Sequence, residues 1–294
     1  MLQHDKRAAP PSLVSALPLP DGRQPFPGAA GVGDESLHAD QPQAFSYTST
    51  KVVPLEFDRL REEAILRDEA GEQGSEAFRM LRTQVLFWLA EHDGSSLAIT
   101  SPGAEDGTSD TAINLALHIA NEVDYTVLLV DANLRSPGIT RKLGIEATRG
   151  LSDHLLEGVP LQDLLLNPGV GRLVVLPAGR AQANSAELLG SRAMARLVME
   201  LKARYPRRII LFDLPGVHES SDVLSFSRHV DGILMVVEEG RSSRAALAQA
   251  EAVLPHQKLV GVAMTQVRGQ GPAKAAARRN PPRRAGWLRR LLSK

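Results

Sequence analysis

Short apolar runs alternate along the middle of the chain with longer stretches in which apolar and polar residues mix at helical spacing. The apolar runs are nearly continuous in Val, Ile and Leu, which is typical of parallel strands buried on both faces. We expect strands at Ser96–Thr100, Thr126–Val130, Leu173–Leu176, Arg208–Asp213, Gly232–Glu238 and Lys258–Met264. Helices are expected between them at Thr111–Val123, Ser191–Arg204, Ser220–Arg228 and Ser243–Val253. The alternation predicts an α/β fold, a doubly wound, mostly parallel sheet with helices on both faces.

The two ends of the chain differ in composition from this middle. Eight of the 19 prolines fall in the first 54 of the 294 residues, mixed with small and polar residues. Such a segment buries too little apolar surface to offset chain entropy. We expect a disordered leader over residues 1–54, an α/β domain over 55–268 and a basic tail over 269–294. No apolar run approaches the length of a membrane span, and the absence of cysteine excludes disulfides and thiolate metal sites.

A net charge of zero conceals an uneven distribution. Ten basic residues and no acidic one follow Glu251, so the first 251 residues carry a net charge of −10. In the tail, four apolar residues would share one face of a short helix whose other face carries arginines: Trp287, Leu288, Leu291 and Leu292. This pattern suits an anionic membrane surface. The alternative is a basic tail that is simply solvated; nucleic acid is not expected, because no aromatic residues interleave with the basic ones.

Candidate chemistry gathers in the loops after the predicted strands, where ligands bind in sheets of this kind. Gly103 and Gly107 lie in the loop after the first strand, Asp131 and Asn133 follow the second, and Asp213 ends the fourth. A glycine-bearing loop between strand and helix, together with strand-end aspartates, is the layout of a P-loop nucleotide site. In such a site backbone N–H groups hold phosphates, and carboxylates hold Mg²⁺ and its waters.

Several sequence blocks occur in the same order as in one known family. They lie between Ser75 and Val267 and read SEAFRMLRTQVLF, AINLALHIANEVDYTVLLVDANLRSP, GLSDHLLEG, LPAGRAQANSAELLGSRAM and RYPRRIILFDLPG. On these blocks the chain resembles the bacterial tyrosine autokinases of exopolysaccharide export, which are deviant-Walker P-loop ATPases. The exosortase-associated subgroup is the most similar. The resemblance implies a P-loop NTPase fold, ATP and Mg²⁺ as ligands, and protein tyrosine kinase activity.

The phosphate loop departs from the family pattern, which is similar to G-E-G-K-[ST]. The resemblance assigns phosphate binding to four loop residues: Gly103, Gly107, Thr108 and Ser109. It assigns Mg²⁺ to Ser109 and Asp213. However, Glu105 replaces a glycine, Thr108 replaces the lysine, and Asp110 adds a carboxylate. The lysine normally neutralises phosphate charge, so its loss and the added carboxylates act against binding. The loop predicts weak or absent ATP binding.

The second motif is altered as well. Its family form resembles three apolar residues followed by D-x-D-x-R, which Asp131 and Arg135 match, whereas Asn133 replaces the second aspartate. An asparagine cannot accept a proton from a hydroxyl. The resemblance places catalysis at Asp131, at position 133 and at Asp213, and the asparagine that contacts adenine falls at Thr265. Impaired catalysis is therefore expected.

A third motif is complete. Glu76, Arg79 and Arg82 reproduce the E-x₂-R-x₂-R signature of the family, and a spacing of three places them on one helix face. The resemblance implies that this face contacts a neighbouring subunit in a ring. The alternative is a solvated helix with an internal Glu–Arg pair.

Three functional hypotheses follow from these residues. The first is a catalytically impaired pseudokinase, a cytoplasmic regulator or scaffold of exopolysaccharide biosynthesis or export at the inner membrane. Its partner would be a membrane-embedded chain-length or export protein. The second is an active tyrosine autokinase, for which Tyr47 is the accessible acceptor, since the tail contains no tyrosine. The third is a partition-type ATPase, which the family signatures disfavour.

Overall fold

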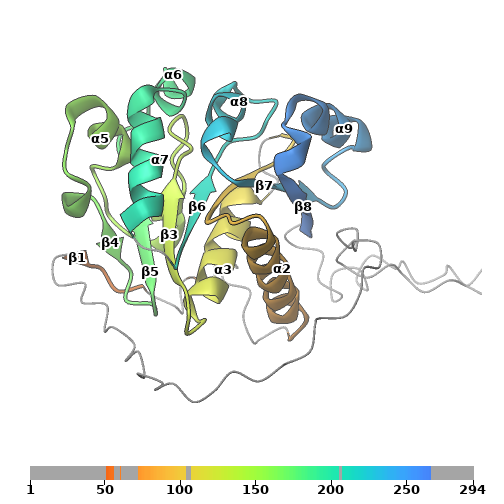
Figure 1. Ribbon diagram of the computed structural model, residues 1–294, viewed down its shortest axis with the longest axis horizontal. Coiled ribbons are helices and arrows are strands. Elements are labelled where there is room, and N and C mark those ends of the chain that lie inside the picture. Colours follow the sequence, from red (N-terminus) through yellow and green to blue (C-terminus); the bar gives the residue numbers. More distant parts are fainter. Residues whose placement is uncertain (1–50, 56–59, 61–71, 104–106, 205–206, 266–294) are drawn as a thin grey trace, which may run out of the picture.

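An eight-stranded sheet forms the centre of the protein (Figure 1). The computed structural model describes residues 51–55, 60, 72–103, 107–204 and 207–265. The strands are β1 (Lys51–Val52), β2 (Ser96–Thr100), β3 (Thr126–Asp131), β4 (Leu166–Asn167), β5 (Leu173–Leu176), β6 (Arg208–Asp213), β7 (Gly232–Glu238) and β8 (Leu259–Thr265). Their order is β1-β4-β5-β3-β6-β2-β7-β8, and only the β4–β5 pair in this described sheet is antiparallel. The predicted doubly wound, mostly parallel sheet is confirmed.

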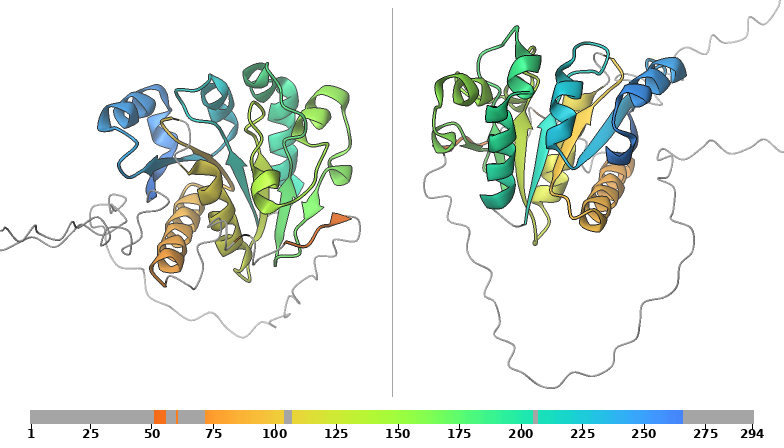
Figure 2. Two further views of the ribbon diagram at one scale, coloured as in Figure 1. Left: turned by 180° about the vertical axis from the view of Figure 1, so that it is seen from behind. Right: turned by 45° about the horizontal axis from the view of Figure 1, so that its top comes forward.

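Helices cover both faces of the sheet (Figures 1 and 2). They are α2 (Glu72–Glu91), α3 (Thr108–Ala120), α4 (Ile139–Leu143), α5 (Leu151–Glu157), α6 (Ser185–Leu189), α7 (Arg192–Arg204), α8 (Asp222–Phe226) and α9 (Arg244–Val253). Helices α2 and α3 pack on one face, and α7 and α8 on the other. Helix α3 begins three residues before the predicted Thr111, so the end of the phosphate loop already belongs to its first turn. No described helix has the length and apolarity that crossing a membrane would require.

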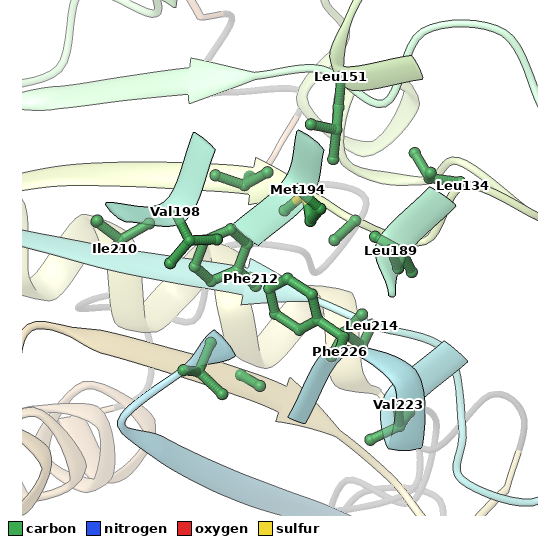
Figure 3. Close-up of a cluster of buried hydrophobic side chains, with 14 of the residues drawn as sticks. Leu134, Leu151, Leu189, Met194, Val198, Ile210, Phe212, Leu214, Val223 and Phe226 are labelled. Atoms are coloured by element: carbon green, nitrogen blue, oxygen red, sulfur yellow. The ribbon is translucent and has the colours of Figure 1, made fainter. Parts of the chain in front are cut away.

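The core has two layers because successive strand residues point to opposite faces. Along β6, Ile210 and Phe212 belong to the layer under α7 and α8, whereas Ile209 and Leu211 belong to the layer under α2 and α3. The Phe212 ring packs on that of Phe226 in α8, with centroids 4.8 Å apart (Figure 3). This core fixes the carboxyl ends of the central strands relative to one another.

The predicted start of the domain needs one correction. Lys51 and Val52 fall within the leader expected over residues 1–54, but they form β1 and pair with Leu166 and Asn167 of β4. A strand of two residues carries no alternation that a sequence pattern could detect. The remaining leader (1–50), the tail (269–294), and the single positions Tyr47 and Glu105 lie outside the described residues.

Candidate functional site

The ends of three central strands meet at one edge of the sheet. Asp131, the last residue of β3, pairs in register with Asp213, the last residue of β6. On the other side of β6, Asp213 pairs with Ile99 of β2, which leads into the phosphate loop. The predicted loop and the two strand-end aspartates are thus brought together, as the positions of the strand ends indicated.

Asp213 is joined directly to the phosphate loop. The Ser109 hydroxyl in the first turn of α3 donates a hydrogen bond of 2.7 Å to Asp213 Oδ2. Burial raises the pKa of Asp213 well above its ordinary value, and the charge of Asp131 raises it further, against the Ser109 hydrogen bond and the charge of Lys142. Its Oδ1 atom has no hydrogen-bond partner among the described residues. Asp213 therefore retains an oxygen that can accept a ligand.

Asp131 anchors the loop that follows β3. Its Oδ2 atom accepts hydrogen bonds of 3.0 Å from the backbone N–H groups of Gly138 and Ile139, which places the start of α4 beside the sheet edge. Burial raises the pKa of Asp131 to about 6, although these donors act in the opposite direction. Within the described part of the chain, Asp131 Oδ1 also lacks a partner. Two buried carboxylates thus each keep one unused oxygen.

The phosphate loop is closely packed where it is described. Gly107 has φ +76°, in the left-handed region that glycine adopts without strain, and a Cβ there would lie 3.4 Å from Thr265 Oγ1. A Cβ at Gly216 would stand 2.6 Å from the Gly103 carbonyl oxygen, so only glycine allows that approach. Thr265, at the position to which the resemblance assigns the adenine contact, therefore lies beside the loop. Thr108 is the first residue of α3, and the loop contributes no lysine.

Lys142 is the residue that the sequence interpretation missed. Its Nζ atom lies 2.7 Å from Asp110 Oδ1, and both side chains are partly buried. Asp110 adds a carboxylate to the site as expected, and its charge raises the pKa of Asp213, but Lys142 pairs with it and offsets part of that charge. The two residues are 32 positions apart in the chain. No local spacing could have revealed this pair, because the sequence gives no sign that the short helix α4, which carries Lys142, lies against the first turn of α3.

Asn133, the altered position of the second motif, forms part of a turn. Asn133 Oδ1 accepts a hydrogen bond of 3.1 Å from the backbone N–H of Ser136. Arg135 donates from Nη2 to the carbonyl oxygen of Ala183, at 3.3 Å. An aspartate at position 133 could accept the same hydrogen bond, so the loop geometry alone does not require asparagine there.

The three residues of the predicted subunit contact do not share one environment. Glu76 and Arg79 form an exposed ion pair of 2.7 Å within α2. Arg82 instead turns toward α3, where its Nη1 atom lies 2.7 Å from Glu122 Oε1. Arg82 therefore helps to dock α2 on α3 within a single chain, together with the stacking of Phe78 on His118.

The donor set fits a Mg²⁺-bound nucleoside triphosphate in part. Hydroxyl and carboxylate oxygens are the ligands that Mg²⁺ prefers, and Ser109 and Asp213 supply them with one buried oxygen unused. The backbone at the start of α3 would hold phosphates, and bound Mg²⁺ would screen phosphate charge. The cation expected from the loop is missing at Thr108, and Lys142 is a positive charge close to that turn.

A glycine-bearing turn between a central strand and a helix, flanked by two strand-end aspartates, is the layout of a P-loop NTPase-type protein. The comparisons with known proteins identify the family. The chain is 31% identical over 208 residues to the tyrosine-protein kinase YwqD of Bacillus subtilis, covering 70% of this chain and 86% of that protein. It is 28% identical over 180 residues to the putative tyrosine-protein kinase CapB of Staphylococcus aureus, covering 61% and 78%. This chain belongs to the bacterial tyrosine-protein kinase family of capsular polysaccharide systems.

Solved structures agree with this assignment. The chimerical protein CapA2B2 superposes with a TM-score of 0.61 at 27% identity, covering 73% of this chain and 92% of that one. The kinase domain of VpsO gives a TM-score of 0.60 at 26% identity, covering 72% and 99%. The succinoglycan biosynthesis transport protein ExoP of Rhizobium meliloti is 32% identical over 191 residues, but the matched part is only 24% of its length. No family model matches the chain.

Proposed function

We propose that this protein acts as a regulator or scaffold of exopolysaccharide biosynthesis or export and does not transfer phosphate at a useful rate. The observation that carries the proposal is Thr108, which stands in the first turn of α3 where the family supplies a lysine. Asn133 adds to it, because an amide cannot take the proton of an attacking hydroxyl. A tyrosine autokinase with residual activity is the second candidate, favoured by the unused oxygens of Asp131 and Asp213.

The partner and the cellular location of this proposed scaffold are inferred from the relatives and from the sequence. Relatives include the tyrosine-protein kinase wzc of Salmonella typhi and the transport protein ExoP, so we propose a membrane-embedded chain-length or export protein as the partner. The basic tail (269–294) would hold the protein to an anionic membrane surface, at about 1 kcal/mol per basic residue. The protein would then be cytoplasmic and peripheral at the inner membrane.

Phosphotyrosine analysis tests the proposal directly. The purified full chain, incubated with Mg²⁺-ATP, is expected to form no phosphotyrosine, because the lysine of the loop and the aspartate at position 133 are both missing. The kinase YwqD, treated identically, serves as the positive reference. Phosphorylation of Tyr47 at a rate comparable with the reference would show that the protein is an active autokinase.

Self-association through α2 is part of the scaffold proposal. Reversing the charge of Arg79 and Arg82 to glutamate is expected to shift the protein to smaller species, since removing one partner of a desolvated interfacial pair costs about 2–5 kcal/mol. The measurement is molar mass by light scattering. An unchanged mass would rule out the ring contact.

Two controls separate assembly from folding and from membrane attachment. In the double variant Arg82→Glu with Glu122→Arg the ion pair between α2 and α3 is rebuilt in reverse, so a loss of mass in this variant comes from a subunit contact. Deleting residues 278–294 should leave the oligomer intact but release the protein from the membrane fraction. If the deleted protein still sediments with membranes, the tail is not the anchor.

A further inference from the structure

Lys142 is a basic side chain that the fold brings to the first turn of α3. Its ammonium group contacts Asp110, and the two side chains are 25% and 15% exposed. A pair with this much burial is screened less by water and salt than a surface pair. Lys142 belongs to α4, not to the phosphate loop, so its charge reaches the site from the β3 side.

The position of α4 is fixed by the site itself. The carboxylate of Asp131 accepts hydrogen bonds from the backbone of Gly138 and Ile139 at the start of this helix. A Cβ at Gly138 would lie 3.6 Å from the Ser109 hydroxyl oxygen, so α4 and the first turn of α3 are in contact there.

We propose that Lys142 supplies the cation that neutralises the phosphate groups of a Mg²⁺-bound nucleoside triphosphate, in place of the lysine that Thr108 replaces. Asp110 holds the ammonium group at the first turn of α3 until phosphate oxygens compete for it. The inference rests on the proposed function in one respect: a protein that does not transfer phosphate could still respond to nucleotide. The weak ATP binding predicted from the phosphate loop alone does not take the charge of Lys142 into account.

Titration calorimetry with Mg²⁺-ATP on the full chain tests this assignment. The wild type is expected to bind, and Lys142→Met is expected to weaken binding by about 10- to 100-fold, the usual effect of losing a charge-assisted contact. Lys202→Met is the matched control, because Lys202 forms a similar ion pair of 2.6 Å with Asp231. Asp231 accepts hydrogen bonds from the backbone N–H groups of Ser95 and Ser96, so this pair lies at the amino end of β2, opposite the site. The control should bind as the wild type does.

A double-mutant cycle separates a phosphate contact from simple neutralisation of Asp110. Asp110→Asn removes the carboxylate and should tighten binding several-fold by removing a negative charge. If Lys142 meets the phosphates, Lys142→Met in the Asp110→Asn background still weakens binding by about 10-fold or more. If Asp110→Asn and the double variant bind Mg²⁺-ATP with equal affinity, the proposal is overturned. A wild type that binds no Mg²⁺-ATP would also overturn it. Thermal unfolding of each variant confirms that it is folded.

The double-mutant cycle and the phosphotyrosine assay test two different proposals, so either proposal can be overturned while the other stands. Binding that depends on Lys142 without phosphotyrosine supports both proposals. Phosphotyrosine with binding that depends on Lys142 overturns the scaffold proposal and leaves the role of Lys142 standing.

Discussion

Thr108→Lys alone is expected to leave the protein without tyrosine kinase activity. The variant regains the loop cation, which is worth about 10²–10³-fold in rate as stabilisation of transition-state charge. It still lacks a carboxylate at position 133, whose contribution as a general base is about 10²–10⁴-fold. Glu105 also remains in the loop. Phosphotyrosine formation and ATP turnover, measured with Mg²⁺-ATP, check this result.

The triple variant Glu105→Gly, Thr108→Lys and Asn133→Asp restores the family residue at all three positions. Its turnover is expected to exceed that of the single variant by at least roughly 10²-fold. The Asn133→Asp change is mild for the fold, because the side-chain oxygen of residue 133 is the acceptor of the Ser136 hydrogen bond. Robust turnover by Thr108→Lys alone would mean that Glu105 and Asn133 do not limit catalysis.

Asp131→Asn is expected to stabilise the protein strongly at neutral pH in metal-free buffer. Burial raises the pKa of Asp131 from 3.8 to about 6, so the folded state disfavours its charged form. The contribution of this carboxyl to stability is therefore most favourable below pH 4, becomes less favourable as pH rises between about 4 and 6, and is constant above pH 6. At 1.36 kcal/mol per pKa unit the cost above pH 6 is about 3 kcal/mol. An asparagine at position 131 avoids this cost, and its side-chain oxygen can still accept hydrogen bonds from the backbone N–H groups of Gly138 and Ile139.

Urea unfolding with EDTA from pH 4 to pH 8 measures this difference. The gain from Asp131→Asn should be largest at pH 8 and disappear near pH 4. Asp231→Asn is a control of opposite sign: burial raises the pKa of Asp231, but Lys202, Ser95 and Ser96 outweigh it and hold the pKa below its ordinary value. That variant should be destabilised throughout this pH range, because a carboxyl whose pKa is lowered keeps its stabilising contribution until the pH falls below about 4. A gain from Asp131→Asn that does not vary with pH would contradict the electrostatic explanation.

The strands that build the site could be predicted because burial on both faces leaves an almost unbroken apolar run. The expected bounds of β2, β5, β6 and β7 agree with the structure, β3 ends one residue later than expected, and β8 is shifted by one residue at both ends. The short elements gave no such signal: α4 and α6 have five residues each, and β1 and β4 have two. Their positions come from tertiary packing and hydrogen bonds.

The candidate site was predictable where it follows the strand ends and not where it depends on contacts across the chain. Asp131 and Asp213 lie at strand ends, so their meeting follows from a parallel sheet. The pairing of Asp110 with Lys142 joins α3 to α4, and that of Arg82 with Glu122 joins α2 to the end of α3. Such pairs depend on how helices dock, and residue spacing carries no information about docking.

The position of β2 has a consequence for the order of folding. This strand, which leads into the phosphate loop, lies between β6 and β7, so Ser96 pairs with Ile210 and Leu97 with Gly232. Both partners follow far later in the chain, and contacts between distant segments form slowly because the intervening loop must first be closed. During synthesis, the nascent chain must therefore extend past β7 before β2, which leads into the loop, can pair with both of its neighbouring strands, β6 and β7. A fragment that ends before β6 contains the loop residues but lacks both neighbours of β2 and also Asp213, so it cannot assemble the site.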